Sequence, residues 1–275
     1  MSRLAPTFAR LQQDNQAAMI PFFTAGDPEP AATLPMLRAL AAAGADVIEL
    51  GVPFSDPMAD GPAIQQANER ALRHGMNLTQ VFAAIKAFRQ ENQHTPIVLM
   101  GYLNPIEVMG YAAFAEAAAL AGVDGVITVD MPPEEAREYV GLLRERQIDP
   151  IFLLAPTSSE ARMQLVAEVA SGFIYYVSMR GITGVGGLDM AEVGARIARL
   201  RQHTSLPLGV GFGIQDAATA GAMARVADAV VVGSAIVREI AAANDVAEAV
   251  ARASALVKDI AAAVHGARHA VQEIA

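Results

Sequence analysis

The chain has 275 residues, a length at which α/β barrels still form single domains and at which a core forms without disulfides or metals. It contains no cysteine, which excludes a disulfide framework, a thiol nucleophile and a cysteine metal site. The net charge of −9 argues against a nucleic-acid-binding protein, which would carry a basic stripe, and against attraction to anionic membranes.

The N-terminal segment MSRLAPTFARLQQDNQ predicts a helix and not a targeting signal. Leu4, Phe8 and Leu11 recur at helical spacing, and no apolar stretch follows a basic start. No apolar run approaches the roughly 18 residues of a membrane span. We therefore expect a soluble, cytoplasmic protein without a signal peptide.

Eight short apolar segments then recur along the chain. Most are continuously apolar, as is typical of parallel strands that are buried on both faces. Alanine-rich or amphipathic segments between them, such as LTQVFAAIKAFRQ and YAAFAEAAALAG, predict helices. The expected strands are Met19–Phe23, Asp46–Leu50, Pro96–Met100, Gly125–Val129, Pro150–Leu154, Phe173–Ser178, Leu206–Gly211 and Asp228–Val232.

This alternation predicts a (β/α)8 TIM barrel in which residues 1–275 form one domain with an extra N-terminal helix. A doubly wound open sheet is the alternative, but the strand number and the lack of G-x-G-x-x-G in the first unit favour the barrel. Three joints share one pattern, AAGADVIELG, LAGVDGVITV and RVADAVVVGS, in which an aspartate precedes a strand. Pro35 falls inside the first expected barrel helix, which indicates a kink or a late start of that helix.

Barrel enzymes carry their chemistry at the carboxyl ends of the strands, so the residues there are the first candidates. The chain has only two lysines, Lys86 and Lys258, both in expected helices, which excludes a Schiff-base aldolase. No histidine stands at a strand end, so we expect no metal centre. The polar, aromatic and methionine side chains at these ends are Phe22, Phe23, Thr24, Asp27, Glu49, Asp56, Asp60, Met100, Tyr102, Asn104, Asp130, Thr157, Tyr175 and Ser178.

His265 and His269 are four residues apart in the last expected helix, a spacing that also suits a metal ion. Two ordinary polar residues on a terminal helix are the better interpretation. Carboxylates must then do any acid–base work.

Glu49 is the main acid–base candidate. Strand alternation places it on the same face as Val47, and if that face is inward the carboxylate lies in an apolar cup. Desolvation there raises a carboxyl pKa, which suits a group that both donates and accepts a proton. The alternative is a structural glutamate paired with a buried hydroxyl such as that of Tyr175.

Asp60 and Asp56 lie in the loop VPFSDPMADGP, which prolines stiffen and glycines turn. A loop of this length on the catalytic face is usually functional, and an aspartate in it can reach a substrate atom. Each aspartate can instead cap its own backbone in a turn, and for Asp56 this is the stronger interpretation.

Glycine-rich segments follow the last three strands: MRGITGVGG, GVGFGI and VVGSAIV. Free backbone N–H groups and a helix N-terminus bind phosphate well, and the loops after strands seven and eight form the usual phosphate site of such barrels. Glycines in barrel loops also serve packing. The order of the three segments nevertheless favours a phosphate-bearing substrate.

The stretch IELGVPFSDPMADGP closely resembles the signature of the tryptophan synthase alpha subunit family. The resemblance continues through PFFTAGDP, GYLNP, YYVSMRGITG, GFGI and VGSAIV, from about Phe8 to Ile240. It implies a lyase that splits indole-3-glycerol phosphate into indole and glyceraldehyde 3-phosphate by retro-aldol cleavage. It also implies a partner beta subunit in an α2β2 heterotetramer, with pyridoxal phosphate held by that partner and no cofactor in this chain.

The resemblance also implies roles for individual residues. Glu49 would protonate carbon 3 of indole and take the proton of the side-chain hydroxyl, and Asp60 would bind the indole N–H and stabilise its positive charge. Met100 replaces an expected leucine, a swap that nearly conserves volume. The substrate-binding residues implied are Phe22, Met100, Tyr175 and Phe212 for indole, and Gly184, Gly213, Gly233 and Ser234 for phosphate.

Two other functions stay open at this point. One is another phosphate-binding barrel enzyme, such as a phosphosugar isomerase, which would not act on indoleglycerol phosphate. The other is a non-catalytic regulatory subunit that binds anions, in which Glu49 is dispensable. The last segment, Ala241–Ala275, is alanine-rich and predicts a helix that closes the barrel or contacts a partner.

Overall fold

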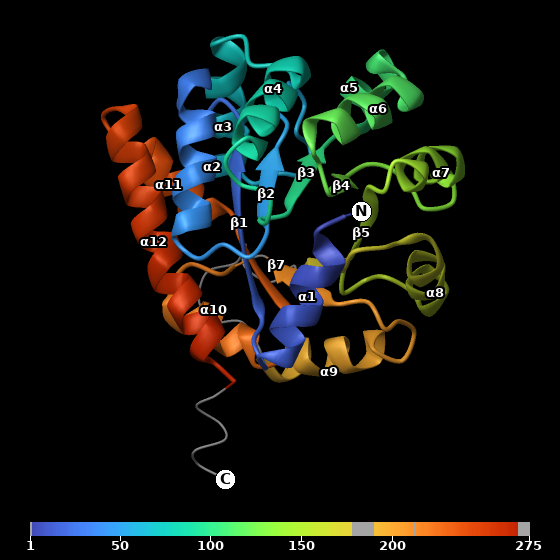
Figure 1. The fold of residues 1–275 in the computed structure, drawn as a ribbon. Coiled ribbons are helices and arrows are strands. Elements are labelled where there is room, and N and C mark those ends of the chain that lie inside the picture. Colours follow the sequence, from blue (N-terminus) through green and yellow to red (C-terminus); the bar gives the residue numbers. More distant parts are fainter. Residues whose placement is uncertain (1, 178–189, 212, 269–275) are drawn as a thin grey trace.

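The computed structural model describes residues 2–177, 190–211 and 213–268, and its strands form a closed parallel barrel in sequence order (Figure 1). The first strand pairs with the eighth, so no strand edge is left open. The predicted TIM barrel is confirmed, and each predicted strand segment overlaps one strand. The strands are β1 (Ala18–Thr24), β2 (Ile48–Gly51), β3 (Ile97–Gly101), β4 (Gly125–Thr128), β5 (Asp149–Leu154), β6 (Ile174–Val177), β7 (Leu208–Gly211) and β8 (Ala229–Val232).

Helices connect and surround the strands, and one short 3-10 helix, η1 (Pro30–Ala32), precedes the second of them. Within the described residues, no helix is both long and apolar enough to cross a membrane. The helices are α1 (Leu4–Gln13), α2 (Thr33–Ala42), α3 (Pro62–Arg73), α4 (Leu78–Arg89), α5 (Leu103–Met109), α6 (Tyr111–Ala121), α7 (Arg137–Glu145), α8 (Glu160–Val169), α9 (Met190–Leu200), α10 (Ala217–Ala224), α11 (Ser234–Ala241) and α12 (Val246–Gly266).

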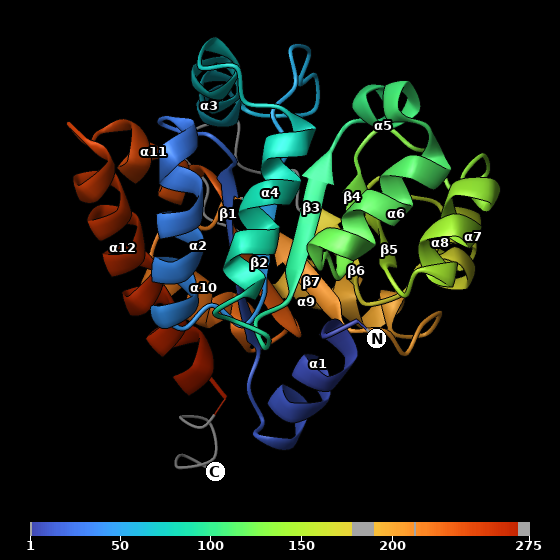
Figure 2. The same cartoon turned by 45° about the horizontal axis from the view of Figure 1, so that its top comes forward.

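Side-chain alternation along the strands divides the core into two layers. In β2, Ile48 and Leu50 point outward into the large cluster between barrel and helices, whereas Val47, just before the strand, points inward. The inner cluster also receives Leu4 and Phe8 of α1. Figure 2 shows α1 across the lower end of the barrel, opposite α3 and α5. The extra N-terminal helix therefore plugs the bottom and leaves the carboxyl ends of the strands for the site.

Pro35 lies in the first turn of α2, because η1 occupies the residues before Thr33 and the α-helix begins only there. The first turn has N–H groups without intrahelical partners, so a proline costs no hydrogen bond at this position. Of the two interpretations made from the sequence, the late start is confirmed.

The three aspartates of the repeated joints share one structural task at the lower rim. Asp46 accepts a hydrogen bond from the N–H of Met19 (3.0 Å), at the start of the preceding strand. Asp124 accepts a hydrogen bond from the N–H of Ile97 (2.8 Å), and Asp228 accepts one from the N–H of Leu208 (2.9 Å). The joint pattern thus ties the start of one strand to the loop that enters its neighbour.

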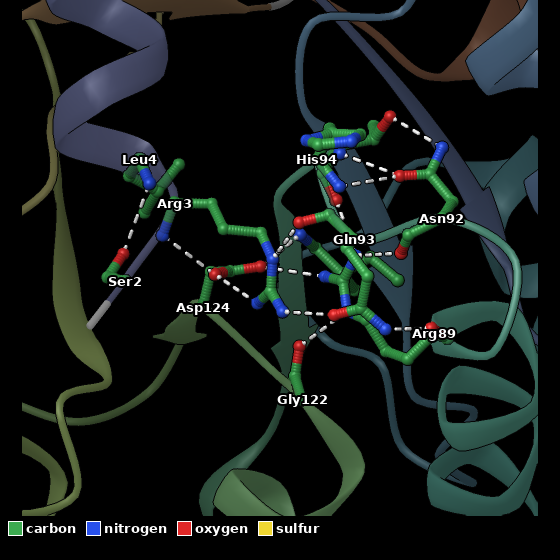
Figure 3. Close-up of polar contacts among 11 residues, drawn as sticks. Ser2, Arg3, Leu4, Arg89, Asn92, Gln93, His94, Gly122 and Asp124 are labelled. Carbon is green, nitrogen blue, oxygen red and sulfur yellow. Dashed lines mark hydrogen bonds and ion pairs between the residues drawn. The ribbon is translucent and has the colours of Figure 1, made fainter.

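Asp124 carries the most buried of these junctions (Figure 3). Its carboxylate accepts from Arg89 Nη2 at 2.8 Å and from Arg3 Nη1 at 2.9 Å. Arg89 is itself only 5% exposed and also donates to the carbonyls of Thr95 (2.7 Å) and Gly122 (2.9 Å). One buried carboxylate therefore links α1, α4 and two strands.

Replacing Asp124 by alanine will lower the free energy of unfolding by about 3–5 kcal/mol, because Arg89 is left buried without its counter-charge. Urea denaturation measures this loss. Asp14→Ala is the control, since Asp14 forms an exposed pair with Arg10 and will cost less than about 1 kcal/mol. Equal losses in the two variants would contradict the buried network.

Candidate active site

Glu49 lies at the inner mouth of the barrel. It stands on β2 in register with Phe22 of β1 on one side and Val98 of β3 on the other. The expected inward direction is confirmed, because Val47 and Val98 both belong to the cluster inside the barrel. Glu49 is 1% exposed, so its carboxyl group lies away from bulk water among apolar neighbours.

The surroundings of Glu49 favour the protonated acid. Its Oε2 atom is buried and has no hydrogen-bond partner among the described residues. Burial, with a smaller contribution from the charge of Asp60, raises the pKa of Glu49 to about 8. The alternative made from the sequence, a structural hydrogen bond to Tyr175, is not among the contacts of the described residues. At neutral pH the carboxyl group is mostly protonated and ready to act as an acid.

Asp60 lies at the end of the loop between β2 and α3, just before the start of α3 at Pro62. Pro62 is the first residue of α3, a position where proline is favourable because no hydrogen bond is lost. The loop therefore ends where this proline starts the helix. The hydroxyl of Tyr102 donates a hydrogen bond to Asp60 Oδ2 at 3.1 Å. Burial raises the pKa of Asp60 to about 6, and the bond from Tyr102 opposes that rise.

The two carboxyl groups therefore differ in protonation at neutral pH. Glu49 holds its proton, whereas Asp60 is mostly ionised. A pair of carboxyl groups whose environments separate their pKa values is a recurring basis for acid–base catalysis. This arrangement can protonate one substrate atom while it stabilises positive charge at another.

The predicted aromatic and apolar residues gather around these carboxyl groups. Phe22 and Met100 line the same cavity as Asp60. Tyr175 stands on β6 and belongs to the cluster inside the barrel. Burial, followed by the charges of Glu49 and Asp60, raises the pKa of its hydroxyl. The structure thus joins five residues that the sequence analysis proposed for one site.

The described members of the predicted phosphate group, Gly213, Gly233 and Ser234, lie after β7 and β8. Gly233 immediately precedes α11, and Ser234 is the first residue of that helix, so their N–H groups lie at a helix N-terminus. A Cβ built on Gly233 would lie 3.3 Å from the Phe22 ring, which places this helix start beside the cavity that Phe22 lines. Gly213 follows β7 with a φ of 76°. Gly184 and Phe212 lie outside the described residues.

Asn68 is a contributor that the sequence analysis missed. It is buried on α3, where its Oδ1 accepts from the N–H of Phe54 (2.8 Å) and its Nδ2 donates to the carbonyl of Ile64 (2.8 Å). It thereby fixes the start of the loop that carries Asp60. The sequence held a weak signal for it, since Asn68 is a polar residue within the buried stripe of Ala67 and Ala71.

Asp27 was noted as a strand-end residue, but its partner was not foreseen. Its two carboxylate oxygens accept from Arg70 Nε (2.6 Å) and Nη2 (2.9 Å). Burial raises the pKa of Asp27 and outweighs the lowering by Arg70. This bidentate pair attaches α3 to the loop after β1. It thereby holds in place the helix that follows Asp60.

The residues considered for lysine or metal chemistry lie elsewhere. Lys86 is in α4 and Lys258 in α12, as expected. His265 Nε2 is 2.7 Å from Asp46 Oδ2 at the lower rim, and His269 lies outside the described residues. No group of three or more potential metal ligands occurs in the described part of the chain.

Comparisons with known proteins agree on one family. The family model described as Tryptophan synthase alpha chain matches residues 8–267. The tryptophan synthase alpha chain of Thioalkalivibrio sulfidiphilus is 61% identical over 88% of this chain and 91% of its own length. That of Methylococcus capsulatus is 60% identical over 89% and 92%. The crystal structure of tryptophan synthase subunit alpha from Legionella pneumophila superposes with a TM-score of 0.90 at 40% identity, covering 96% of this chain and 98% of that chain.

The burial of Glu49 predicts a pH-dependent effect on stability. Between its ordinary pKa of 4.5 and the folded value of about 8, the unfolded chain loses this proton and the folded chain keeps it. Stability therefore falls as pH rises through this window, by up to roughly 1.4 kcal/mol per pH unit, and the full deficit is present above about pH 8. Glu49→Gln will remove the deficit, so its stability relative to the unchanged chain will increase from pH 4.5 to 8.

Urea denaturation at several pH values measures this difference. Glu91→Gln is the control, because Glu91 is an exposed carboxylate paired with Arg38. A difference between Glu49→Gln and the unchanged chain that does not vary from pH 4.5 to 8 would contradict the raised pKa.

Proposed function

This chain belongs to the tryptophan synthase alpha chain family, which cleaves indole-3-glycerol phosphate in tryptophan biosynthesis, and we propose that Glu49 and Asp60 perform the proton transfers of that cleavage. The family membership makes the chain a lyase. One observation carries the assignment of roles: a buried carboxyl group at the inner mouth of the barrel, whose Oε2 has no hydrogen-bond partner among the described residues, lies beside a second carboxylate.

In the first step, the protonated Glu49 donates its proton to carbon 3 of the indole ring. The ring nitrogen becomes positively charged, and the ionised Asp60 accepts a hydrogen bond from its N–H and stabilises that charge. The pKa order of the two groups suits this division, because the group of higher pKa starts protonated and the group of lower pKa starts charged.

In the second step, the Glu49 carboxylate takes the proton of the hydroxyl on the carbon attached to the ring. The carbon–carbon bond breaks, its electron pair returns to the ring and neutralises the nitrogen, and the former alcohol carbon becomes the aldehyde. The products are indole and glyceraldehyde 3-phosphate, and Glu49 is again protonated. The cycle needs no metal and no Schiff base.

We assign the two ends of the substrate to different elements. Phe22, Met100, Tyr175 and Phe212 enclose the indole ring. Gly184, Gly213, Gly233 and Ser234 hold the phosphate, with the N–H groups at the start of α11 and the helix dipole supplying the attraction. The proximity of Gly233 to Phe22 supports a substrate that spans both regions.

The alpha chain of this family pairs with a beta subunit in an α2β2 tetramer and needs no cofactor of its own. We propose that pyridoxal phosphate is held by the beta subunit, and that the complex works in the cytoplasm. We also propose that residues 1–275 act as one barrel domain, which agrees with the match of the family model to residues 8–267.

Glu49→Gln will reduce the rate of indole release from indole-3-glycerol phosphate by at least about 100-fold, because the amide keeps the shape but transfers no proton. Asp60→Asn will also lose most activity while the KM for the substrate changes little. Indole release by the purified chain with its beta subunit is the measurement. The exposed control Glu91→Gln will keep full activity. Near-normal indole release by Glu49→Gln would refute the assignment.

Ser234→Pro will raise KM roughly 10-fold or more, because it removes one N–H donor to a charged group. Proline is favourable at the first position of a helix, but it disfavours the αR conformation that Gly233 has before it, so an unchanged urea midpoint must accompany the rise in KM. Ser234→Ala is the matched control: it keeps the N–H, and its KM will change less than about 3-fold. Steady-state kinetics compare the two. A larger effect of Ser234→Ala would show that the hydroxyl, and not the amide, binds phosphate.

A further inference from the structure

Tyr102 connects the end of β3 to the loop that carries Asp60. It immediately follows β3 and is 4% exposed. Its ring stacks on Phe54 near the start of the loop, with centroids 5.3 Å apart and planes 27° from parallel. Its hydroxyl reaches the other end, where it contacts Ala59 and Asp60. A single side chain therefore holds both ends of the loop.

The hydrogen bonds of this hydroxyl have a fixed direction. The N–H of Ala59 donates to the Tyr102 oxygen at 3.0 Å, and the hydroxyl proton is then directed to Asp60 Oδ2 at 3.1 Å. A phenol has one proton to donate, so Asp60 is its acceptor. Burial, followed by the charge of Asp60, raises the pKa of the Tyr102 hydroxyl, so the phenol keeps that proton across the working pH range.

Other contacts in this region hold the backbone of the loop and not the carboxylate. The N–H of Asp60 donates to the carbonyl of Pro57 (3.0 Å), and Gln65 Nε2 donates to the carbonyl of Asp60 (2.9 Å). Asn68 binds the N–H of Phe54. Within the described residues, the hydrogen bond to the Asp60 carboxylate comes from Tyr102.

We propose that Tyr102 is a positioning residue for the cleavage, whose hydroxyl holds the Asp60 carboxylate in the cavity that Asp60 shares with Phe22 and Met100. The inference rests on the proposed role of Asp60 at the indole N–H. It makes the end of β3 part of the acid–base machinery, although Tyr102 itself transfers no proton. The hydrogen bond from Tyr102 lowers the pKa of Asp60 and so opposes burial, which raises that pKa and favours the neutral form.

Tyr102→Phe tests this on the complex with the beta subunit, because phenylalanine keeps the ring stack on Phe54 and removes only the hydroxyl. We expect kcat for indole release to fall roughly 10-fold, as for one lost hydrogen bond to a charged group, with KM changed less than about 2-fold. The acid limb of the kcat–pH profile will move to higher pH, because Asp60 then binds its proton more tightly.

Tyr111→Phe is the matched control, since Tyr111 also donates its hydroxyl to a carboxylate, that of Glu107, but on α5 and α6, away from the cavity. It will leave kcat and the acid limb unchanged. In a chain that already carries Asp60→Asn, Tyr102→Phe will cause no further loss of the residual rate, because the carboxylate that Tyr102 positions is gone.

Two results would overturn the inference. One is a Tyr102→Phe variant with the kcat and pH profile of Tyr111→Phe. The other is a loss of activity that accompanies a lower urea midpoint while the acid limb stays in place, which would make the role structural. If Asp60→Asn alone cleaves normally, the proposed role of Asp60 fails. If Asp60→Asn is inactive and Tyr102→Phe is normal, only the role of Tyr102 fails.

Discussion

The burial of the Glu49 carboxyl group, which has no counter-charge among the described residues, is the constraint around which the site is organised. An ionised carboxylate in an apolar interior is costly, so the pKa of Glu49 is raised and the carboxyl group keeps its proton at neutral pH. An arginine beside it would stabilise the fold and would hold the carboxylate ionised, which would remove its ability to act as an acid at neutral pH. Stability is given up at the position where we propose that proton transfer occurs.

At the opposite rim of the barrel, where the strands begin, three carboxylates are paired with counter-charges. Asp46, Asp124 and Asp228 are each paired with arginine and bonded to the backbone of a neighbouring strand. There the charges are satisfied, and α1 closes the barrel beneath them (Figure 2). The molecule therefore separates its carboxyl groups along the barrel axis: paired aspartates at the amino ends maintain the fold, and the weakly compensated Glu49 and Asp60 at the carboxyl ends are the groups that we propose for the chemistry.

The sequence predicted the parts of this arrangement that depend on local patterns. Apolar periodicity located all eight strands, and strand alternation placed Glu49 inside the barrel. The hydrogen bond between Phe54 and Asn68 and the pairing of Asp27 with Arg70 escaped it, because each joins residues 14 or more positions apart and no local pattern records which loop folds over which helix. Gly184 and Phe212 keep the status of sequence-based predictions, since they lie outside the described residues.

The two carboxyl groups reach different pKa values by different means, and their positions in the chain explain why. Glu49 stands on a strand whose neighbours on both sides are apolar, so burial dominates and the pKa rises to about 8. Asp60 stands on a loop whose end lies beside β3, where a tyrosine donates a hydrogen bond, and its pKa rises only to about 6. The separation follows from placing one acid within the barrel wall and the other on the loop above it. A barrel that carried both acids on strands would bury both and would leave neither ionised at neutral pH.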